Sequence, residues 1–176
     1  MNDVRRKHAL FWGLIVSWVT ADVVTKAWAA SRLVPERVPH AVLGDVVRFT
    51  LIHNPGAAFG MHIGEWSRWV FTVLTIAALV MLAHLFRETR PADWRRTLAL
   101  ALVTAGAIGN LVDRLFSSRG VIDFIDIGTP QWRFWTFNVA DIGVSCGAVL
   151  LAFVLWREER AHQALARSEP SQPSPS

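Results

Sequence analysis

The sequence predicts an all-α polytopic membrane protein, with four transmembrane helices and a small outer segment that contains β-structure. Of its 176 residues, 52% are apolar and only 18% are charged, whereas soluble domains carry about 25% charged residues. Four apolar runs approach or reach the roughly 20 residues that a helix needs to cross a bilayer. Because Cys146 is the single cysteine, an internal disulfide framework is excluded.

The four apolar runs predict spans at about residues 9–30, 69–86, 97–116 and 137–156. The second run contains no formal charge, and the third ends in charged residues. The first contains Asp22 and Lys26, and the fourth has Asp141 near its start. Charges at such depth are costly, so these three residues need a structural or functional reason.

The segments around the spans are polar or mixed. An outer segment at residues 31–68 includes the Val-, Phe- and Thr-rich stretch 46–52, which indicates a short strand or hairpin at the membrane surface. Residues 1–160 are expected to form a single membrane-embedded domain. Residues 161–176, which end in Ser and Pro, are expected to be a disordered cytoplasmic tail.

The distribution of basic residues predicts the orientation. Ten Arg and Lys residues flank the spans on the side of both termini, and seven lie in the longer loops of the other side. The positive-inside rule therefore places both termini in the cytoplasm. A basic net charge of +4 would otherwise suggest nucleic acid as a partner, but these residues lie between membrane spans.

The N-terminus also resembles a cleavable signal peptide, because Arg5, Arg6 and Lys7 precede an apolar run. That run, however, exceeds the usual length of such a segment. Asp22 and Lys26 lie four residues apart, on one face of a helix. This polar pair favours a retained helix whose charged face contacts protein.

Polar residues that are uncommon in membrane spans all map to the outer ends of the spans or to the adjoining outer loops. They are Asp22, Lys26, Asn54, Asn110, Asp113, Arg114, Asp123, Asn138 and Asp141. The spacing of Asn110 and Asp113, and of Asn138 and Asp141, puts each pair on one helix face. Each residue alone could be a helix cap or part of a buried ion pair. Together they indicate a site at one depth.

The available residue types limit the chemistry of such a site. The six His are scattered without the spacing of a zinc protease. Ser17 and Ser145, the most deeply placed hydroxyls, have no base at a local spacing. Gly143-Val144-Ser145-Cys146-Gly147 matches the Gly-x-Ser-x-Gly pattern, but it lies inside a predicted span and not at the strand-to-helix turn of a nucleophile elbow. A pair of carboxylates remains. In a poorly solvated site the two would share one proton, so that the ionised one activates water and the protonated one assists the leaving group.

These polar residues leave two other classes of protein open. A small transporter or channel subunit could use Asp22, Lys26 and Asp141 as an ion path, but its polar residues should then run through the bilayer. A non-enzymatic assembly subunit could use the polar residues for helix packing. Spacing alone does not choose which carboxylates form the pair.

At these residues the chain resembles lipoprotein signal peptidase, or signal peptidase II, a bacterial inner-membrane aspartyl protease. The resemblance covers residues from about 10 to 156. It rests on five blocks that occur in the family's order: Asp22-Val23-Val24-Thr25-Lys26, Asn54-Pro55-Gly56-Ala57-Ala58-Phe59-Gly60, Gly106-Ala107-Ile108-Gly109-Asn110-Leu111-Val112-Asp113-Arg114, Val121-Ile122-Asp123-Phe124 and Phe137-Asn138-Val139-Ala140-Asp141.

The resemblance implies that Asp123 and Asp141 are the catalytic dyad, with Asp22 and Lys26 as a structural or accessory pair. The implied supporting and substrate-binding residues are Asn54, Gly56, Ala58, Phe59, Asn110, Asp113, Arg114 and Asn138. It further implies no metal or other cofactor, a monomer, and a site near the periplasmic face of the inner membrane. The substrate would be a diacylglyceryl-modified prolipoprotein, cleaved on the N-terminal side of its lipidated cysteine, and globomycin would inhibit the enzyme.

Two positions depart from the family pattern. Val23 stands where the family commonly has Gln, and the loop at Ser117, Ser118 and Arg119 is slightly long. Neither departure touches the implied dyad, so they concern local contacts and not the reaction.

Overall fold

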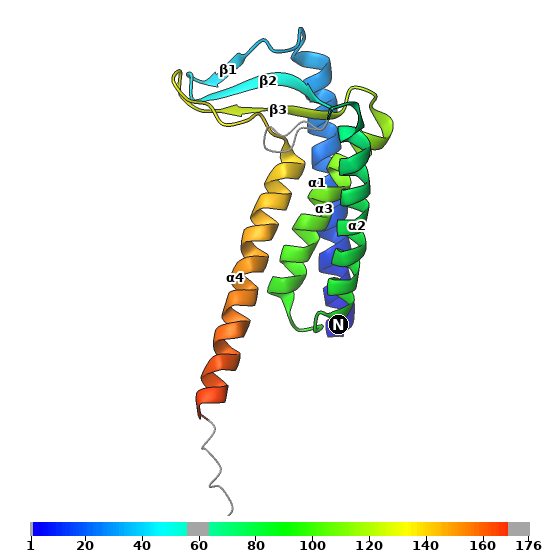
Figure 1. Cartoon of the computed structure of the whole chain (residues 1–176), viewed down its shortest axis with the longest axis vertical. Coiled ribbons are helices and arrows are strands. Elements are labelled where there is room, and N and C mark those ends of the chain that lie inside the picture. The colour runs from blue at the N-terminus through cyan, green and yellow to red at the C-terminus, as the bar shows by residue number, and fades with distance from the viewer. Residues whose placement is uncertain (1, 56–63, 169–176) are drawn as a thin grey trace, which may run out of the picture.

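The computed structural model describes residues 2–55 and 64–168. Its four helices are α1 (Asp3–Arg32), α2 (Ser67–Glu88), α3 (Trp94–Phe116) and α4 (Val139–Ser168). A short 3₁₀ helix, Gly64–Trp66, precedes α2. The strands β1 (His40–Leu43), β2 (Val47–Asn54) and β3 (Val121–Ile127) form one sheet across one end of the helices (Figure 1). This confirms the predicted fold class of four membrane-crossing helices and a small β-containing segment.

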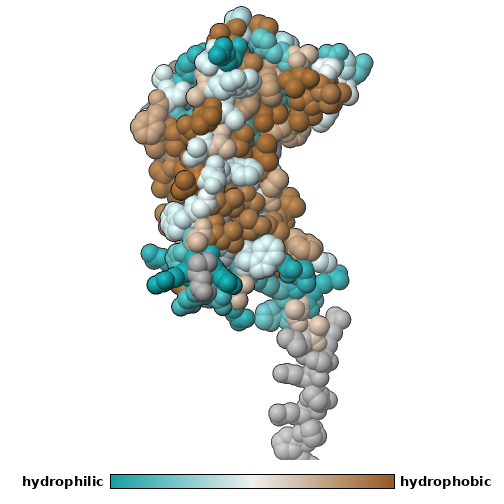
Figure 2. Space-filling model, turned by 180° about the vertical axis from the view of Figure 1, so that it is seen from behind, coloured by the Kyte–Doolittle hydropathy of each residue, from teal (hydrophilic) through white to brown (hydrophobic). Residues whose placement is uncertain are grey.

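All four helices are long and apolar enough to cross a membrane, α4 over Val139–Ala164. Large apolar side chains such as Val16, Val80 and Val149 are exposed along them. Figure 2 shows apolar surface over the middle of the molecule and hydrophilic surface at the end of the helices opposite the sheet. The molecule is therefore a multi-pass membrane protein whose helices present their apolar sides to lipid.

Helix α3 is the centre of the bundle, and the other three helices pack against it. At the end opposite the sheet, the rings of Phe11 and Phe86 stack with centroids 3.8 Å apart, over the fully buried Leu100. Helix α4 lies close to α3 at Gly106, where an added Cβ would stand 2.2 Å from the carbonyl oxygen of Ala140. Further along, α4 stays close to α3 at Gly147, where an added Cβ would stand 2.9 Å from the carbonyl oxygen of Ala99, while it diverges from α1 (Figure 1).

The helices extend beyond the apolar runs that predict them. Asn2 caps α1 by accepting a hydrogen bond from the backbone of Val4, and the helix starts at Asp3. Helix α4 continues to Ser168, so residues 161–168 are helical where the sequence predicts disorder. Residues 158–166 are mostly good helix formers, and Gln163 donates to Glu159 one turn earlier. The remainder of that tail lies outside the described residues.

The sheet is antiparallel with strand order β1-β2-β3. Its register shifts between Phe49 and Ile52 of β2, and Ile52 then pairs with Asp123 of β3. A second apolar cluster of Ala29, Leu33, Leu51 and Phe124 packs the sheet against the end of α1. This cluster fixes the height at which β3 crosses the bundle, and so the position of Asp123.

Candidate active site

Asp141 is held at the start of α4 by a reciprocal cap. The Oδ1 atom of Asn138 accepts from the backbone N–H of Asp141 at 3.0 Å, and Asp141 Oδ2 accepts from the backbone N–H of Asn138 at 3.1 Å. This is the geometry of a capping box, which satisfies two backbone donors that a helix start leaves unpaired. The local sequence thus fixes the carboxylate at the positive end of the helix dipole.

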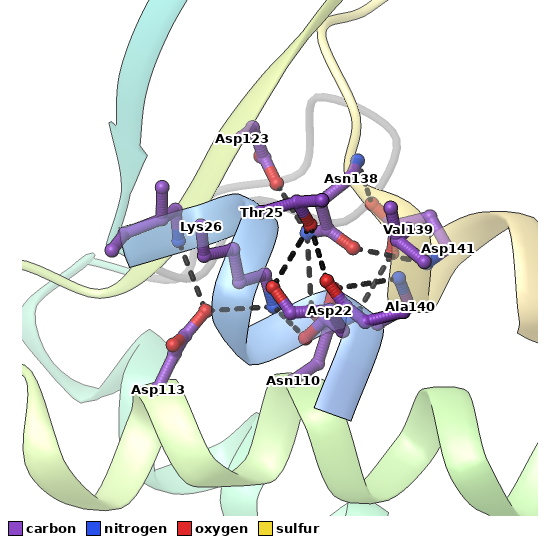
Figure 3. Close-up of polar contacts among 12 residues, drawn as sticks. Asp22, Thr25, Lys26, Asn110, Asp113, Asp123, Asn138, Val139, Ala140 and Asp141 are labelled. Atoms are coloured by element: carbon purple, nitrogen blue, oxygen red, sulfur yellow. Dashed lines mark hydrogen bonds and ion pairs between the residues drawn. The ribbon is translucent and has the colours of Figure 1, made fainter. Parts of the chain in front are cut away.

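The same Asn138 connects α4 to β3 and α3. Its Nδ2 atom donates to Asp123 Oδ1 at 2.7 Å and to Asn110 Oδ1 at 3.1 Å. The side chain is fully buried. Figure 3 shows Asp123, which comes from β3, and Asp141, which comes from α4, near Asn138. One residue therefore joins the two carboxylates: its side-chain amide donates to Asp123 of β3, and its backbone N–H donates to Asp141 of α4.

Asp123 is 5% exposed and is surrounded by amides. Its Oδ2 atom accepts from Asn54 Nδ2 at 3.2 Å, and its Oδ1 atom accepts from Asn138. Burial, together with the neighbouring charge of Asp141, raises the pKa of Asp123 to about 7, although the two amide donors act in the opposite direction. At neutral pH this carboxyl group can therefore gain or lose a proton.

A buried ion network supports the two carboxylates from α1 and α3. Lys26 Nζ lies 2.7 Å from Asp22 Oδ2, 2.8 Å from Asp113 Oδ2 and 3.1 Å from Asn110 Oδ1. Asn110 Nδ2 in turn donates to Asp141 Oδ1 at 2.8 Å. These contacts join α1, α3 and α4 near the sheet (Figure 3).

Two backbone groups close the network. Asp22 Oδ1 accepts from the N–H of Ala140 at 2.8 Å, and Asp113 Oδ2 accepts from the N–H of Ile122 at 3.1 Å. The first contact ties α1 to the start of α4, and the second ties α3 to β3. The side chains that position both carboxylates are therefore bonded to the elements that carry them.

The structure brings eight of the site residues expected from the sequence into one hydrogen-bonded network. They are Asp22, Lys26, Asn54, Asn110, Asp113, Asp123, Asn138 and Asp141. Arg114 stands at its margin: its guanidinium lies 5.9 Å from the ring of Phe71, and its charge acts on Asp113, Asp123 and Asp141. Gly56, Ala58 and Phe59 lie outside the described residues.

Sequence reasoning missed the apolar wall beside Asp141. A pocket of about 260 Å³ is lined by Phe134, Phe137, Asp141, Ile142, Ser145 and Cys146. Asp141 and Ser145, like Ile142 and Cys146, are four residues apart on α4 and therefore share a face. That spacing was the available signal. The pocket gives one carboxylate of the pair an apolar neighbourhood open to a substrate.

The arrangement suits acid–base chemistry. The two carboxylates accept four hydrogen bonds from amide or backbone donors, and Asp22 holds the start of α4 by accepting from the N–H of Ala140. Two carboxylates that meet in a desolvated site can share a proton, so that one acts as a base while the other acts as an acid. Among the residues that the structure describes, no cluster of His, Cys, Asp or Glu could hold a metal ion.

Comparisons with known proteins agree in one family. The family model described as signal peptidase (SPase) II matches residues 14–157. A lipoprotein signal peptidase of Hydrogenovibrio crunogenus is 40% identical, covering 96% of this chain and 97% of its own length. One from Rhodococcus jostii is 39% identical over 85% of this chain and 74% of its own.

A solved bacterial membrane enzyme has a similar fold, with a TM-score of 0.74 and 26% identity over 92% of each chain. A second has a TM-score of 0.71 and 30% identity, covering 81% of this chain and 89% of its own. The lipoprotein signal peptidases therefore resemble this chain in sequence, and the two solved membrane enzymes resemble it in fold.

Proposed function

The chain belongs to the signal peptidase II family of lipoprotein signal peptidases, and on that premise we propose that it is an aspartic protease whose dyad is Asp123 and Asp141. It removes the signal peptide from diacylglyceryl-modified prolipoproteins by cleaving on the N-terminal side of the lipidated cysteine. The observation that carries this proposal is the pair of carboxylates from β3 and α4, joined through Asn138, with the pKa of Asp123 raised to about 7.

The reaction needs one proton shared by the pair. The ionised carboxylate takes a proton from water as the water oxygen attacks the scissile carbonyl carbon. The protonated carboxyl group donates its hydrogen bond to the carbonyl oxygen as charge develops there. Collapse of the tetrahedral intermediate breaks the C–N bond, and the amine of the cysteine leaves with a proton from the dyad. No covalent enzyme intermediate is required.

The proposal includes the surroundings of the dyad. The supporting residues are those of the buried network, together with Arg114, and the substrate also contacts Gly56, Ala58 and Phe59. Residues 1–160 act as one domain, as a monomer in the inner membrane, with both termini cytoplasmic and the sheet on the periplasmic side. The basic residues at the end of the helices opposite the sheet support this orientation. We expect globomycin to block the reaction.

The location of the polar groups favours a protease over an ion path. The buried network lies where the helices meet the sheet (Figure 1), whereas α2 is apolar through its middle and the bundle packs around Phe11, Leu82 and Leu100. An ion path would need polar groups along the whole bilayer. The observed concentration at one end suits a site that meets its substrate near the membrane surface.

The test uses the full-length protein in lipid nanodiscs and a diacylglyceryl-modified prolipoprotein. We expect Asp123→Asn and Asp141→Asn each to lower the cleavage rate by about 10²–10⁴-fold, measured by the mass of the released signal peptide. The double variant should be no slower than the slower single variant, because the two groups act as a unit. Near-normal turnover of either single variant, with a folded protein, would remove that residue from the dyad.

A further inference from the structure

Lys26 is a buried cation with all of its hydrogen-bonding capacity in use. The side chain is 2% exposed. Its ammonium group has three protons to donate, and it lies within 3.1 Å of three acceptors on three residues: Asp22, Asp113 and Asn110. Since Asp22 lies on α1 and the other two lie on α3, the ammonium group has a single position in the bundle.

The third of these contacts decides how Asn110 is oriented. Asn110 Oδ1 accepts from Lys26 Nζ at 3.1 Å and from Asn138 Nδ2 at 3.1 Å. If the amide were turned over, its NH₂ group would face these two donors, and none of the three could accept. The amide is therefore held with Nδ2 directed at Asp141 Oδ1, to which it donates at 2.8 Å.

We propose that Lys26 is a positioning residue that acts through the amide of Asn110 to keep Asp141 as the ionised, water-activating base and Asp123 as the proton-bearing acid. This assignment rests on the proposed function. Both oxygens of Asp141 accept from fixed donors, Asn110 Nδ2 and the backbone N–H of Asn138. Asp141 also lies in the first turn of α4, where the helix dipole favours a negative charge.

Asp123 differs from Asp141 in one of these features. Both of its oxygens also accept hydrogen bonds, from Asn54 and Asn138, but it lies on a strand, which has no comparable dipole. Burial and the charge of Asp141 raise the pKa of Asp123 to about 7. The two carboxylates are therefore unequal, and the contact between Lys26 and Asn110 is on the side of Asp141.

Other charged groups face this contact and enter the pH behaviour. Asp22 from α1 and Asp113 from α3 both pair with Lys26. Arg114 from α3 acts on Asp113, Asp123 and Asp141. The charge of Lys26 also lowers the pKa of Asp123 directly, so its loss is expected to move the basic limb of the profile as well, and the acid limb is the limb that tests the route through Asn110. Removal of the cation alone would leave two carboxylates buried without their partner, so the experiment needs variants that separate positioning from stability.

The experiment measures the pH profile of cleavage for Lys26→Met in nanodiscs. We expect kcat on the acid side of the optimum to fall about 10–100-fold, the acid limb to move to higher pH by about one unit, and KM to change less than about twofold. In an Asn110→Ala background, Lys26→Met should produce no further movement of the acid limb, because the group through which it acts is gone.

Lys7→Met is the matched control. Lys7 is also a buried lysine of α1, but it donates to the carbonyl oxygens of Phe86 and Thr89, both at 2.6 Å, at the opposite end of the helix. We expect it to lower the unfolding midpoint of the protein and to leave the shape of the pH profile unchanged. If Lys26→Met does not fold, the double variant Lys26→Met/Asp113→Asn removes one unpaired carboxylate along with the cation, and the same shift is expected.

Two results would overturn the assignment. One is a loss of activity by the same factor at every pH, which would leave the shape of the profile unchanged, as expected for Lys7→Met. The other is an acid limb that moves as far in the Asn110→Ala background as in the parent. Either result leaves the dyad intact if Asp123→Asn and Asp141→Asn remain inactive. Active dyad variants would instead contradict the proposed function itself.

Discussion

Asp123 and Asp126 lie three residues apart on β3, and both are buried, at 5% and 7% exposure. Because side chains alternate along a strand, they point to opposite faces of the sheet. Asp123 is bonded to the amides of Asn54 and Asn138. Asp126 is bonded to Arg133 Nε at 2.6 Å and to Thr50 at 3.0 Å, and it lies 3.5 Å from Arg48 Nε.

The difference lies in the charge of the partners. Two arginines satisfy the charge of Asp126, and Arg133 also donates to the carbonyl oxygens of Asp45 and Asp126. This cluster ties the β1–β2 turn and the segment after β3 to the sheet. Amides, in contrast, orient Asp123 without neutralising it. The same residue type on one strand therefore serves as a structural anchor in one place and is left able to exchange a proton in the other.

The largest expected contrast is in catalysis. Asp123→Asn should reduce cleavage about 10²–10⁴-fold, because it replaces a proton-exchanging group by one that cannot exchange. Asp126→Asn should leave the rate per folded molecule within about threefold of the parent. Cleavage of a lipidated prolipoprotein, normalised to folded protein, measures both. Equal losses would mean that the two carboxylates do not differ in role.

For stability we expect the opposite: the cluster around Asp126 should contribute more than the surroundings of Asp123. Arg133→Met removes three hydrogen bonds from the cluster and leaves Asp126 with less neutralising charge. We expect the free energy of unfolding to fall by about 1–3 kcal/mol, measured by denaturant titration in mixed micelles with tryptophan fluorescence. Arg119→Met is the control, since its guanidinium is exposed and pairs with Glu36. A smaller loss for Arg133→Met than for the control would contradict the anchoring role.

The raised pKa of Asp123 gives a pH dependence with a definite sign. An unfolded Asp has a pKa near 3.9, and the folded value is about 7. Between these values the native state binds more protons than the unfolded state, so the free energy of unfolding falls as pH rises through this window. In Asp123→Asn, we expect the free energy of unfolding to decrease less with pH. At pH 8 it should be about 1–2 kcal/mol higher than in the parent protein.

Unfolding titrations at pH 4.5 and pH 8 would measure that difference. Asp126→Asn serves as the comparison and should lose stability at both values. If Asp123→Asn were less stable than the parent at pH 8, the carboxylate would have to be stabilised by its surroundings, contrary to the raised pKa.

The smallest expected effect compares the two β2 residues that donate to these carboxylates. Thr50→Val removes one donor from Asp126, which keeps its arginines. We expect a loss of about 0.5–1.5 kcal/mol in stability and an unchanged cleavage rate. Asn54→Leu removes a donor from Asp123 and should instead slow cleavage by about tenfold. A rate loss for Thr50→Val of the same size would show that the two faces of the sheet are coupled.

The sequence predicted the parts of the fold that depend on local composition. The four membrane-crossing helices follow from the lengths of the apolar runs, and the gathering of polar groups follows from their place at the outer end of each run. The helix ends were less accessible, because hydropathy reports the part of a helix that lies in lipid. Helix α1 therefore begins at Asp3, several residues before the apolar run.

Long-range contacts were beyond prediction from one sequence. The bond between Asp22 and the N–H of Ala140 joins residues 118 positions apart and involves a backbone group that any residue could supply. Asp126 was missed because its pairing with Arg48 depends on the register of β2 and β3, in which the two residues are cross-strand partners, and this register shifts between Phe49 and Ile52. Neither the register nor the shift has a composition signal. Sequence spacing predicted which polar residues share a face of α3 or α4. The hydrogen bonds that orient their amides are seen only in the structure.

Helix α4 is fastened to α3 along much of its length. Its first turn is bonded to α1 through Asp22 and to α3 through Asn110. Further along the helix, an added Cβ at Gly147 would stand 2.9 Å from the carbonyl oxygen of Ala99, and beyond that Arg96 lies 3.5 Å from Glu158. A larger side chain at position 147 would therefore push the two helices apart and tilt the turn of α4 that carries Asp141.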